Sequence, residues 1–242
     1  MSAVLDRLFT RWYPLVMGVS ERAGQSGIRR AQLSHASGRT LEIGAGSGLS
    51  VPYYGDRVTQ LVLVEPDADF RIALHRTIGD LTPAWWPVTV VDADAHGLPF
   101  EDATFDTVTA SFTFCSLQEP DLGLQELHRV LRPGGQFLFH EHVRGHGRRA
   151  WFQDLMTPLQ VLLAGGCHPN RDFVDTLRRS PFRIDQVIQD RIPRAFPTIS
   201  PVVLGTASRQ VQPHRHSAAP SQGGQRPTSQ PAPPRRPTPM LG

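Results

Sequence analysis

The sequence contains no lysine, so arginine supplies all 25 of its fixed positive charges. A Schiff-base lysine and a lysine general base are therefore excluded. The G-x-x-x-x-G-K-[ST] loop is excluded as well, because its lysine contacts the nucleotide phosphates. Enzymes that depend on any of these three features do not fit the chain.

Cysteine is almost as scarce. Only Cys115 and Cys167 occur, too few for the disulfide framework of a small secreted protein, and neither belongs to a C-x-x-C metal motif. We expect Cys115, which follows an apolar segment, to be a small buried residue. His140, His142, Cys167 and His168 are of metal-binding types, but they flank a long predicted helix without a recognised spacing. The sequence therefore predicts no metal site.

Long hydrophobic runs are also missing. The first residues carry the charges of Asp6, Arg7 and Arg11, and no apolar stretch has the length of a signal-peptide core or of a membrane-spanning helix. We expect a protein without a membrane span that works in the reducing cytoplasm.

Acidic residues are absent from residues 209–242, which hold five arginines and eight of the 22 prolines. With almost no large apolar residue, this segment cannot bury enough surface to offset the entropy of ordering, so we predict a disordered tail. The other 208 residues carry 20 arginines against 22 acidic residues. The basic isoelectric point, about 9.4, therefore comes from the tail, and nucleic-acid binding is not expected.

Residues 1–208 have the length of one α/β domain. Residues 1–37 show apolar positions at helical spacing, interrupted by Pro14, and predict a helical lead-in that caps the sheet. Short apolar segments then alternate with helical ones, which is typical of βαβ units and of a mostly parallel, doubly wound sheet. Seven strands are expected, at residues 40–43, 60–64, 88–92, 105–111, 136–140, 184–188 and 202–207. Helices are expected at residues 68–79, 122–131, 151–163 and 171–179, the last of them capped by Asn170.

Glycines and carboxylates gather where the first three predicted strands end. The first strand leads into Gly44-Ala45-Gly46-Ser47-Gly48, and glycine is needed where a ligand approaches the backbone so closely that a Cβ would clash. The second strand ends at Glu65, followed by Pro66, where a carboxylate can accept hydrogen bonds from ribose hydroxyls. Asp94 follows the third strand beside apolar residues, as an acceptor for an adenine amine would.

Two other function classes share part of this layout. An NAD(P)-dependent oxidoreductase of the Rossmann type also has a strand, a glycine loop and an acidic residue, but its loop is G-x-G-x-x-G, whereas the glycines here are spaced G-x-G-x-G. A non-catalytic nucleoside-binding module would instead retain the pocket and act through its basic tail. Packing alone also explains many glycines at such turns.

The stretches LEIGAGSG, LVEPD, DADAHGLPF, FDTVTASFTFCSL and LHRVLRPGGQFLF follow one another between about residues 38 and 142. Together they resemble the class I S-adenosylmethionine-dependent methyltransferases, in particular the type 11 group that includes the quinone-biosynthesis methyltransferases. Glu141-His142-Val143 and the later Gly166-Cys167 pair are similar to the methyltransferase-like thiol S-methyltransferases. The resemblance implies a Rossmann-like cofactor-binding core at residues 38–142, completed by residues 143–208, and S-adenosylmethionine as the cofactor.

The family pattern also implies roles for individual residues. Glu42 would support the glycine loop and the methionine amine, Glu65 would bind the ribose hydroxyls, and Asp94 with the Ala95 backbone would hold the adenine. Ser111, at the end of the fourth strand, would lie near the methionine end. The cofactor-binding residues implied in this way are Glu42, Gly44, Ala45, Gly46, Gly48, Glu65, Pro66, Asp94, Ala95 and Ser111.

Methyl transfer depends more on the positioning of the acceptor than on acid–base catalysis. The sulfonium makes transfer easy once a nucleophile is held in line, and a base is needed only where the acceptor must lose a proton. His140, Glu141 and His142 are the catalytic candidates, with the two histidines on one face of the extended chain and Glu141 on the other. The alternative interpretation is a histidine that caps the strand and another that is solvated.

Trp12, Tyr13 and the helix at residues 151–163 are candidates for the walls of an acceptor pocket, unless they only pack as amphipathic helices. Apolar walls favour a small, lipophilic acceptor over a charged polymer. We therefore predict an S-adenosylmethionine-dependent methyltransferase (EC 2.1.1) that acts on a small molecule. The sequence defines neither the acceptor atom nor the oligomeric state.

Overall fold

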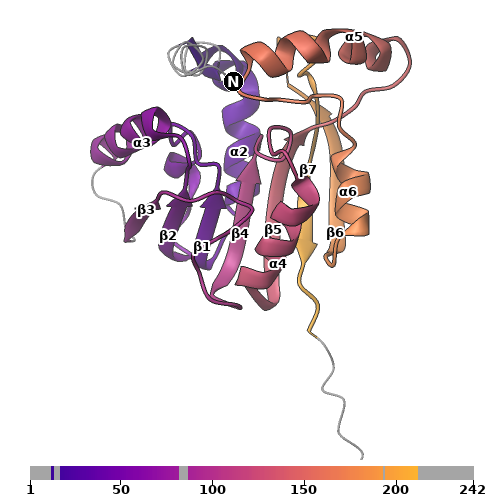
Figure 1. Ribbon diagram of the computed structural model, residues 1–242. Coiled ribbons are helices and arrows are strands. Elements are labelled where there is room, and N and C mark those ends of the chain that lie inside the picture. The colour runs from indigo at the N-terminus through magenta and orange to yellow at the C-terminus, as the bar shows by residue number, and fades with distance from the viewer. Residues whose placement is uncertain (1–11, 14–16, 82–86, 193, 212–242) are drawn as a thin grey trace, which may run out of the picture. The chain divides into compact units, whose positions relative to one another are not determined.

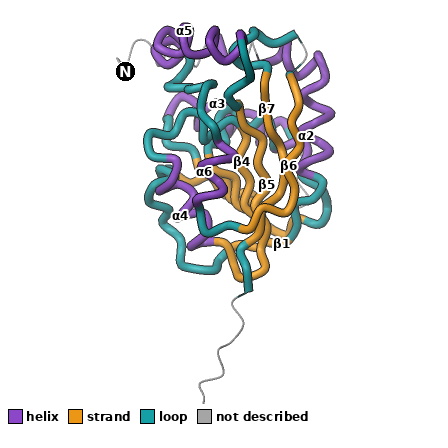
Figure 2. Tube along the Cα trace, turned by 90° about the vertical axis from the view of Figure 1, so that its right-hand side faces the viewer, coloured by secondary structure: helices purple, strands orange, loops and turns teal. Residues whose placement is uncertain are grey.

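The computed structural model of the chain describes residues 12–13, 17–81, 87–192 and 194–211. Within these residues the strands form a seven-stranded sheet in the order β3-β2-β1-β4-β5-β7-β6, with helices on both faces (Figures 1 and 2). The predicted doubly wound, mostly parallel α/β architecture is confirmed. β1 to β5 are parallel, and β7 lies antiparallel between β5 and β6.

All seven predicted strands are present, most of them longer than expected. Their bounds are Gly38–Ile43 (β1), Val58–Val64 (β2), Val88–Val91 (β3), Phe105–Ser111 (β4), Leu131–His142 (β5), Arg183–Arg191 (β6) and Pro201–Ser208 (β7). The largest difference is at the start of β5, where Leu131 pairs with Phe105 but Gln136 pairs with Thr107. The residues between them bulge out of register, with Gly134 at a φ of +79°, so the strand begins before this bulge and continues after it.

The helices agree with the predicted segments to within a few residues. Their bounds are Glu21–Gln25 (η1), Ser26–Leu33 (α2), Val51–Tyr53 (η2), Ala68–Asp80 (α3), Pro120–Val130 (α4), Arg148–Leu163 (α5) and Phe173–Arg179 (α6). The lead-in is helical where it is described, with a break at Gly24, whose φ is +123°. Pro14, the expected kink, lies outside the described residues.

The cap of α6 differs from the prediction. Asp172, not Asn170, is the N-cap residue, and its carboxylate accepts a hydrogen bond from the Asp175 N–H at 2.9 Å. Asp172 is better placed to cap the helix because it lies three residues before Asp175, whose N–H in the first turn needs an acceptor. The Asn170 amide instead donates to Asp154 at 3.0 Å.

The hydrogen-bonded fold extends at least one residue beyond the expected boundary at residue 208. The Arg209 guanidinium donates to the carbonyl oxygens of His128, Arg129 and Leu131, and its N–H donates to Gly135. Residues 212–242, the rest of the predicted tail, lie outside the described residues. Among the residues described, no helix combines the length and apolarity needed to cross a bilayer.

The central strands are buried on both faces, as covered parallel sheets are. On β2, Val62 and Val64 belong to one apolar cluster, whereas Leu61 and Leu63 belong to a second cluster on the other face of the sheet. Each fully buried aliphatic side chain contributes about 1.5–3 kcal/mol. α4 and α6 cover one face and α2 covers the other (Figure 2).

The strand order reverses between β1 and β4, because the chain first builds outward through β2 and β3 and then returns to the other side of β1. At such a point the loops that follow the two strands turn in opposite directions, which leaves a crevice at the carboxyl edge of the sheet. α5 lies across one end of the sheet (Figure 1).

One buried side chain fastens α5 to the rest of the fold. The Nε2 of Gln153 donates to the carbonyl oxygens of Val143 (3.1 Å), Pro169 (3.0 Å) and Thr198 (2.8 Å). Its Oε1 accepts from the Gly145 N–H at 2.7 Å. A single residue therefore satisfies four backbone groups from three different segments.

We expect Gln153→Leu to lower the free energy of unfolding by about 4 kcal/mol or more, because leucine leaves four backbone groups without partners at about 1–3 kcal/mol each. Urea denaturation measures the loss. Gln189→Leu, on the exposed surface of β6, is the control and should change stability by no more than about 0.5 kcal/mol. Equal losses in the two variants would contradict the role given to Gln153.

Candidate active site

The three glycines of the loop after β1 have different environments. Gly46 has a φ of +55°, and a Cβ added there would meet nothing within 4 Å, so its backbone faces open space. Gly48 packs against α3 instead, because a Cβ there would come within 2.8 Å of the Leu74 side chain. A Cβ on Gly44 would come within 2.6 Å of Thr113. The loop therefore needs glycine for close packing at two positions and for an open backbone at the third.

Glu65 joins this loop to the end of β2. Its Oε2 accepts from the Gly46 N–H at 2.8 Å, and its Oε1 accepts from the Asp67 N–H at 2.9 Å. Burial raises the pKa of the carboxyl group, while the two N–H donors oppose the rise. Each carboxylate oxygen still has a lone pair for a further hydrogen bond, so the group can bind hydroxyls while it holds the loop.

A cavity of about 690 Å³ opens at this edge of the sheet, bordered by the residues after β1, β2, β3 and β4. Seven of the ten predicted cofactor residues line it: Gly44, Gly46, Glu65, Pro66, Asp94, Ala95 and Ser111. The Asp94 carboxylate accepts from the His96 N–H at 2.8 Å.

The remaining three predicted residues, Glu42, Ala45 and Gly48, do not line the cavity. Ala45 and Gly48 belong to the glycine loop, and Glu42 lies on β1 just before it. Glu42 is buried, and its Oε2 accepts from the Tyr54 hydroxyl at 3.1 Å. Burial raises the pKa of Glu42 to about 7, against the effects of hydrogen bonds from Ser50 and Tyr54 and of the Arg29 charge.

A second cavity, of about 340 Å³, lies beside the first. Trp12 and Tyr13 line it, as does one side of α5, and these are the segments that the sequence offered as candidate pocket walls. Most of its walls are apolar. The apolar residues are Trp12, Met17, Phe112, Met156, Leu159, Leu163, Ala164, Ile192, Phe196 and Ile199.

Three residues, Tyr13, Phe112 and Ser116, line both cavities. Phe112 has a φ of +56°, which is rare for a bulky residue and marks a backbone held in place by its surroundings. Its ring packs against those of His140 and His142, with centroid distances of 4.5 and 4.4 Å. The cavities therefore adjoin at a wall that the loop after β4 and the lead-in supply.

The three predicted catalytic residues have separate environments. His140 is fully buried, lines neither cavity and forms no side-chain hydrogen bond in the described part of the chain; burial lowers its pKa to about 3. Glu141 points to the other face, where it accepts from the N–H groups of Thr113 (2.8 Å), Phe114 (3.0 Å) and Cys115 (3.2 Å). Neither His140 nor Glu141 lines either of the two cavities, so of the three candidates only His142 reaches one.

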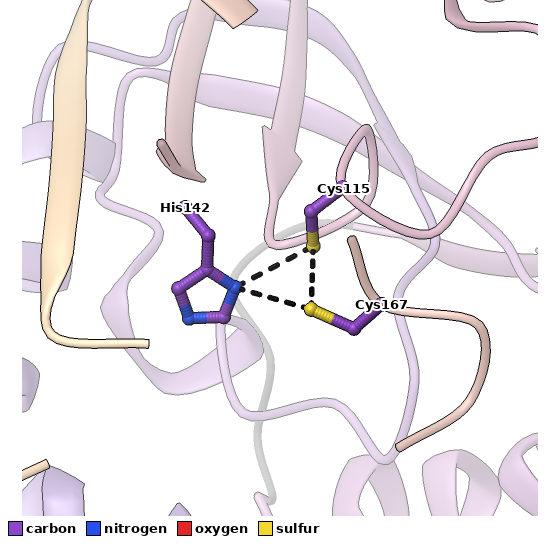
Figure 3. Close-up of side chains that lie close together, drawn as sticks. All are labelled: Cys115, His142 and Cys167. Atoms are coloured by element: carbon purple, nitrogen blue, oxygen red, sulfur yellow. Dashed lines mark hydrogen bonds between the residues drawn. The ribbon is translucent and has the colours of Figure 1, made fainter. Parts of the chain in front are cut away.

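His142 does line the smaller cavity, where it meets both cysteines (Figure 3). Its Nδ1 lies 3.5 Å from the Cys115 Sγ and 3.6 Å from the Cys167 Sγ, and the two sulfurs are 3.5 Å apart. Cys115 is buried, as predicted, and the adjoining Cys167 thiol and burial raise its pKa. The sequence analysis set His142 and Cys167 side by side as metal-binding types, but it assigned Cys115 only to the core and so did not predict this cluster.

Comparison with known proteins agrees with this geometry. Residues 41–139 match the model of a family described as "Methyltransferase domain". Thiol S-methyltransferase TMT1A of Homo sapiens is 29% identical over 206 residues, which cover 84% of this chain and 80% of that protein. Thiol S-methyltransferase TMT1B of Homo sapiens is 30% identical over 181 residues, covering 72% and 73% respectively.

The fold has close solved counterparts. A crystal structure of a S-adenosylmethionine-dependent methyltransferase from Thermotoga maritima superposes with a TM-score of 0.64 at 19% identity, covering 84% of this chain and 99% of that one. At this identity the likeness shows the fold alone.

The fold and the carboxyl-edge cavity define an α/β protein with a Rossmann-like core. The chain belongs to the class I S-adenosylmethionine-dependent methyltransferases of the type 11 group, with S-adenosylmethionine as its cosubstrate. These findings favour this prediction over the oxidoreductase and over the non-catalytic module.

The buried carboxyl group of Glu42 makes stability depend on pH. Its pKa is about 7 in the folded chain and about 4.5 ordinarily, so folding favours the protonated form. As pH rises between these values the unfolded chain loses a proton that the folded chain keeps, and stability falls by up to about 1.4 kcal/mol per pH unit.

We expect Glu42→Gln to remove this dependence of stability on pH. Its unfolding free energy relative to the wild type should rise between about pH 4.5 and about pH 7 and stay level above that range, as urea denaturation without cofactor would measure. Glu101→Gln, on the surface, should give a difference that does not vary with pH. If the difference in unfolding free energy between Glu42→Gln and the wild type does not vary with pH, the raised pKa of the buried carboxyl group is contradicted.

Proposed function

We propose that S-adenosylmethionine occupies the larger cavity with its ribose at Glu65, its adenine beside Asp94 and Ala95, and its methionine end near Gly44 and Ser111. The chemistry of the cavity supports this arrangement. The cosubstrate carries no phosphate, and its hydroxyls and amines need the carboxylates and backbone groups found here. The open backbone at Gly46 leaves space that any larger residue would fill. When bound, the cosubstrate supplies an electrophilic methyl group.

We expect Glu65→Ala to weaken binding of S-adenosylmethionine by about tenfold or more, since the carboxylate both accepts from the ribose and holds the loop. Gly46→Val should abolish binding, because its side chain would enter the cavity from a backbone with positive φ. Titration calorimetry measures both. Gly55→Val, where a Cβ meets nothing and φ is not positive, should bind normally; unchanged affinity in all three variants would remove the assignment.

We further propose that the enzyme methylates the sulfur of small, lipophilic thiols. The observation that carries this proposal is the apolar cavity of about 340 Å³ that adjoins the cofactor cavity across Tyr13, Phe112 and Ser116. Its volume lies at the low end of the usual range for small-molecule sites, about 300–1,000 Å³. An acceptor in this cavity would reach the donor only at the shared wall.

The choice of sulfur follows from what such a cavity can bind and activate. An apolar pocket binds a thiol at a smaller desolvation cost than an alcohol or an ammonium group, which need hydrogen bonds when buried. A thiol ionises near pH 8.5, so its nucleophilic thiolate forms far more readily than an alkoxide. The polar groups that this cavity offers include two thiols and an imidazole beside Ser116. The human relatives that cover most of the chain are named for transfer to thiols.

A matched series of acceptors tests the proposal. Purified protein is incubated with methyl-labelled S-adenosylmethionine and benzyl mercaptan, benzyl alcohol or benzylamine, and the products are identified by mass spectrometry. We expect methyl benzyl sulfide at a rate at least about a hundredfold above methylation of the other two, a difference of about 2.7 kcal/mol in the barrier. Comparable transfer to the alcohol or amine, or no transfer to the thiol, would overturn the sulfur assignment.

A hydrophilic thiol tests the lipophilic preference separately. Glutathione is too large and too charged for a cavity with these walls, so it should be a poor acceptor compared with benzyl mercaptan. Met156→Asp, which puts a charge on the α5 wall, should raise the KM for benzyl mercaptan and leave the affinity for S-adenosylmethionine unchanged. If glutathione is the better acceptor, the apolar cavity is not the acceptor site.

A further inference from the structure

Cys115, His142 and Cys167 form a cluster that methyl transfer from S-adenosylmethionine does not itself require. We propose that these three side chains bind one Zn²⁺ ion, and that the fourth coordination position of the metal takes the sulfur of the acceptor. The second half of this inference rests on the proposed thiol acceptor; the first half does not. The three ligand atoms lie within 4.8 Å of one another (Figure 3).

The distances between the ligand atoms are those of one face of a zinc tetrahedron. With Zn–S near 2.3 Å and Zn–N near 2.0–2.1 Å, tetrahedral geometry requires about 3.8 Å between two sulfurs and about 3.6 Å from sulfur to nitrogen. The observed distances are 3.5 Å between the sulfurs and 3.5 and 3.6 Å from the sulfurs to Nδ1. A shift of a few tenths of an ångström would complete the geometry.

The types of ligand favour zinc among the common divalent ions. Thiolate and imidazole together suit Zn²⁺, whereas Mg²⁺ and Ca²⁺ prefer oxygen ligands. Two thiolates balance the charge of the metal, so the occupied site would be electrically neutral. Neutrality matters because both cysteines are buried in an apolar surrounding, where an uncompensated charge would be costly.

The fold holds each ligand in place before any metal arrives. Glu141 fixes the Cys115 backbone through its N–H, and Phe112 packs against the His142 ring. The His168 N–H donates to the Cys115 carbonyl oxygen at 2.7 Å, which ties the Cys167 segment to the Cys115 loop. The cluster therefore results from contacts that set the positions of three separate segments.

The coordination set is open on the side of the cavity. In the described part of the chain, the group has no fourth ligand, whether histidine, cysteine or carboxylate. All three ligands line the apolar cavity, so the remaining position faces the space where the acceptor would bind. Three protein ligands with one open position are the arrangement of catalytic rather than structural zinc sites.

An acceptor thiol at this position would bind as its thiolate and release its proton to water, because zinc lowers the pKa of a coordinated thiol. The thiolate sulfur then attacks the methyl carbon of the sulfonium. One sulfur–carbon bond forms and one breaks, which yields a methyl thioether and neutral S-adenosylhomocysteine. A thioether is a weak ligand of zinc, so the product leaves the metal and the three-ligand site is restored.

Metal content tests the site without any assay of activity. The full chain, expressed with zinc in the medium and purified under argon with a phosphine reductant, should carry about one zinc per chain by plasma mass spectrometry. Cys115→Ser, Cys167→Ser and His142→Ala should each retain less than about a tenth of that amount. His146→Gln, an exposed histidine four residues from His142, is the matched control and should keep its zinc.

Two results would overturn the site. One is a wild-type chain that remains free of zinc after incubation with excess Zn²⁺, whether its cysteines are thiols or a Cys115–Cys167 disulfide. The other is zinc that persists when both cysteines are replaced. Calorimetric binding of S-adenosylmethionine to each variant separates loss of metal from loss of fold, because none of the three ligands lines the larger cavity.

Cobalt provides a second measurement that needs only the wild type. Co²⁺ in place of zinc should give intense visible absorption typical of tetrahedral coordination and a sulfur-to-cobalt band in the near ultraviolet. Benzyl mercaptan should change both bands, whereas benzyl alcohol should not. A six-coordinate cobalt spectrum, or one unchanged by benzyl mercaptan, would contradict the open fourth position.

The outcomes also separate this inference from the proposed function. Stoichiometric zinc in an enzyme that does not methylate benzyl mercaptan would leave the metal site standing and remove the thiol acceptor. Full turnover of benzyl mercaptan by a zinc-free chain would leave the thiol acceptor standing and remove the metal site.

Discussion

The arrangement of the site depends on one buried carboxylate. Glu141 accepts three consecutive backbone N–H groups, those of Thr113, Phe114 and Cys115, where the chain leaves β4. From the other side, the Arg171 guanidinium donates to the Phe114 carbonyl oxygen at 2.8 Å and to that of Leu117. The Glu141 carboxyl group thus accepts from the donors of the loop, and the Arg171 cation donates to its acceptors. Hydrogen bonds to a charged group such as this guanidinium are the stronger kind.

This anchoring explains why an aromatic residue can adopt a positive φ at the head of the loop. Strain of this kind costs about 1–3 kcal/mol and persists only where surrounding contacts determine the backbone. Here it turns the Phe112 ring into the wall between the two cavities and toward His140 and His142. The same loop directs Cys115 into the smaller cavity, so the divided site and the sulfur cluster have a common structural origin.

Much of the fold was predictable because local signals agree with it. The seven strands follow from short apolar runs, and β2 alternates between two apolar clusters as a strand covered on both faces must. The start of β5 was less predictable: Arg132-Pro133-Gly134-Gly135 indicates a turn, and only the pairing with β4 shows that it forms a bulge within the strand. Asp172 and Asn170 are both good caps, and the choice between them depends on which residue precedes the first turn.

The residues of the site likewise divide into those that the sequence could predict and those that it could not. Glu65, Asp94 and Gly46 lie at strand ends, where their sequence positions are enough to bring them to one cavity. The cluster of Cys115, His142 and Cys167 comes from the ends of β4, β5 and α5, separated by 27 and 25 residues, and no spacing rule connects them. His140 and Glu141 were catalytic candidates with His142 because all three stand at the end of the fifth predicted strand, yet both are fully buried, on opposite faces of β5. Alternation shows which residues share a face, but not which face is open.

Tyr13, from the lead-in, forms part of the wall of both cavities, and its ring meets that of Phe70 on α3 edge-on at 5.5 Å. A ligand in either cavity would therefore lie against the same side chain of the lead-in. Because Tyr13 and Phe112 belong to the walls of both cavities, a substitution at either residue would change the shape of both compartments at once.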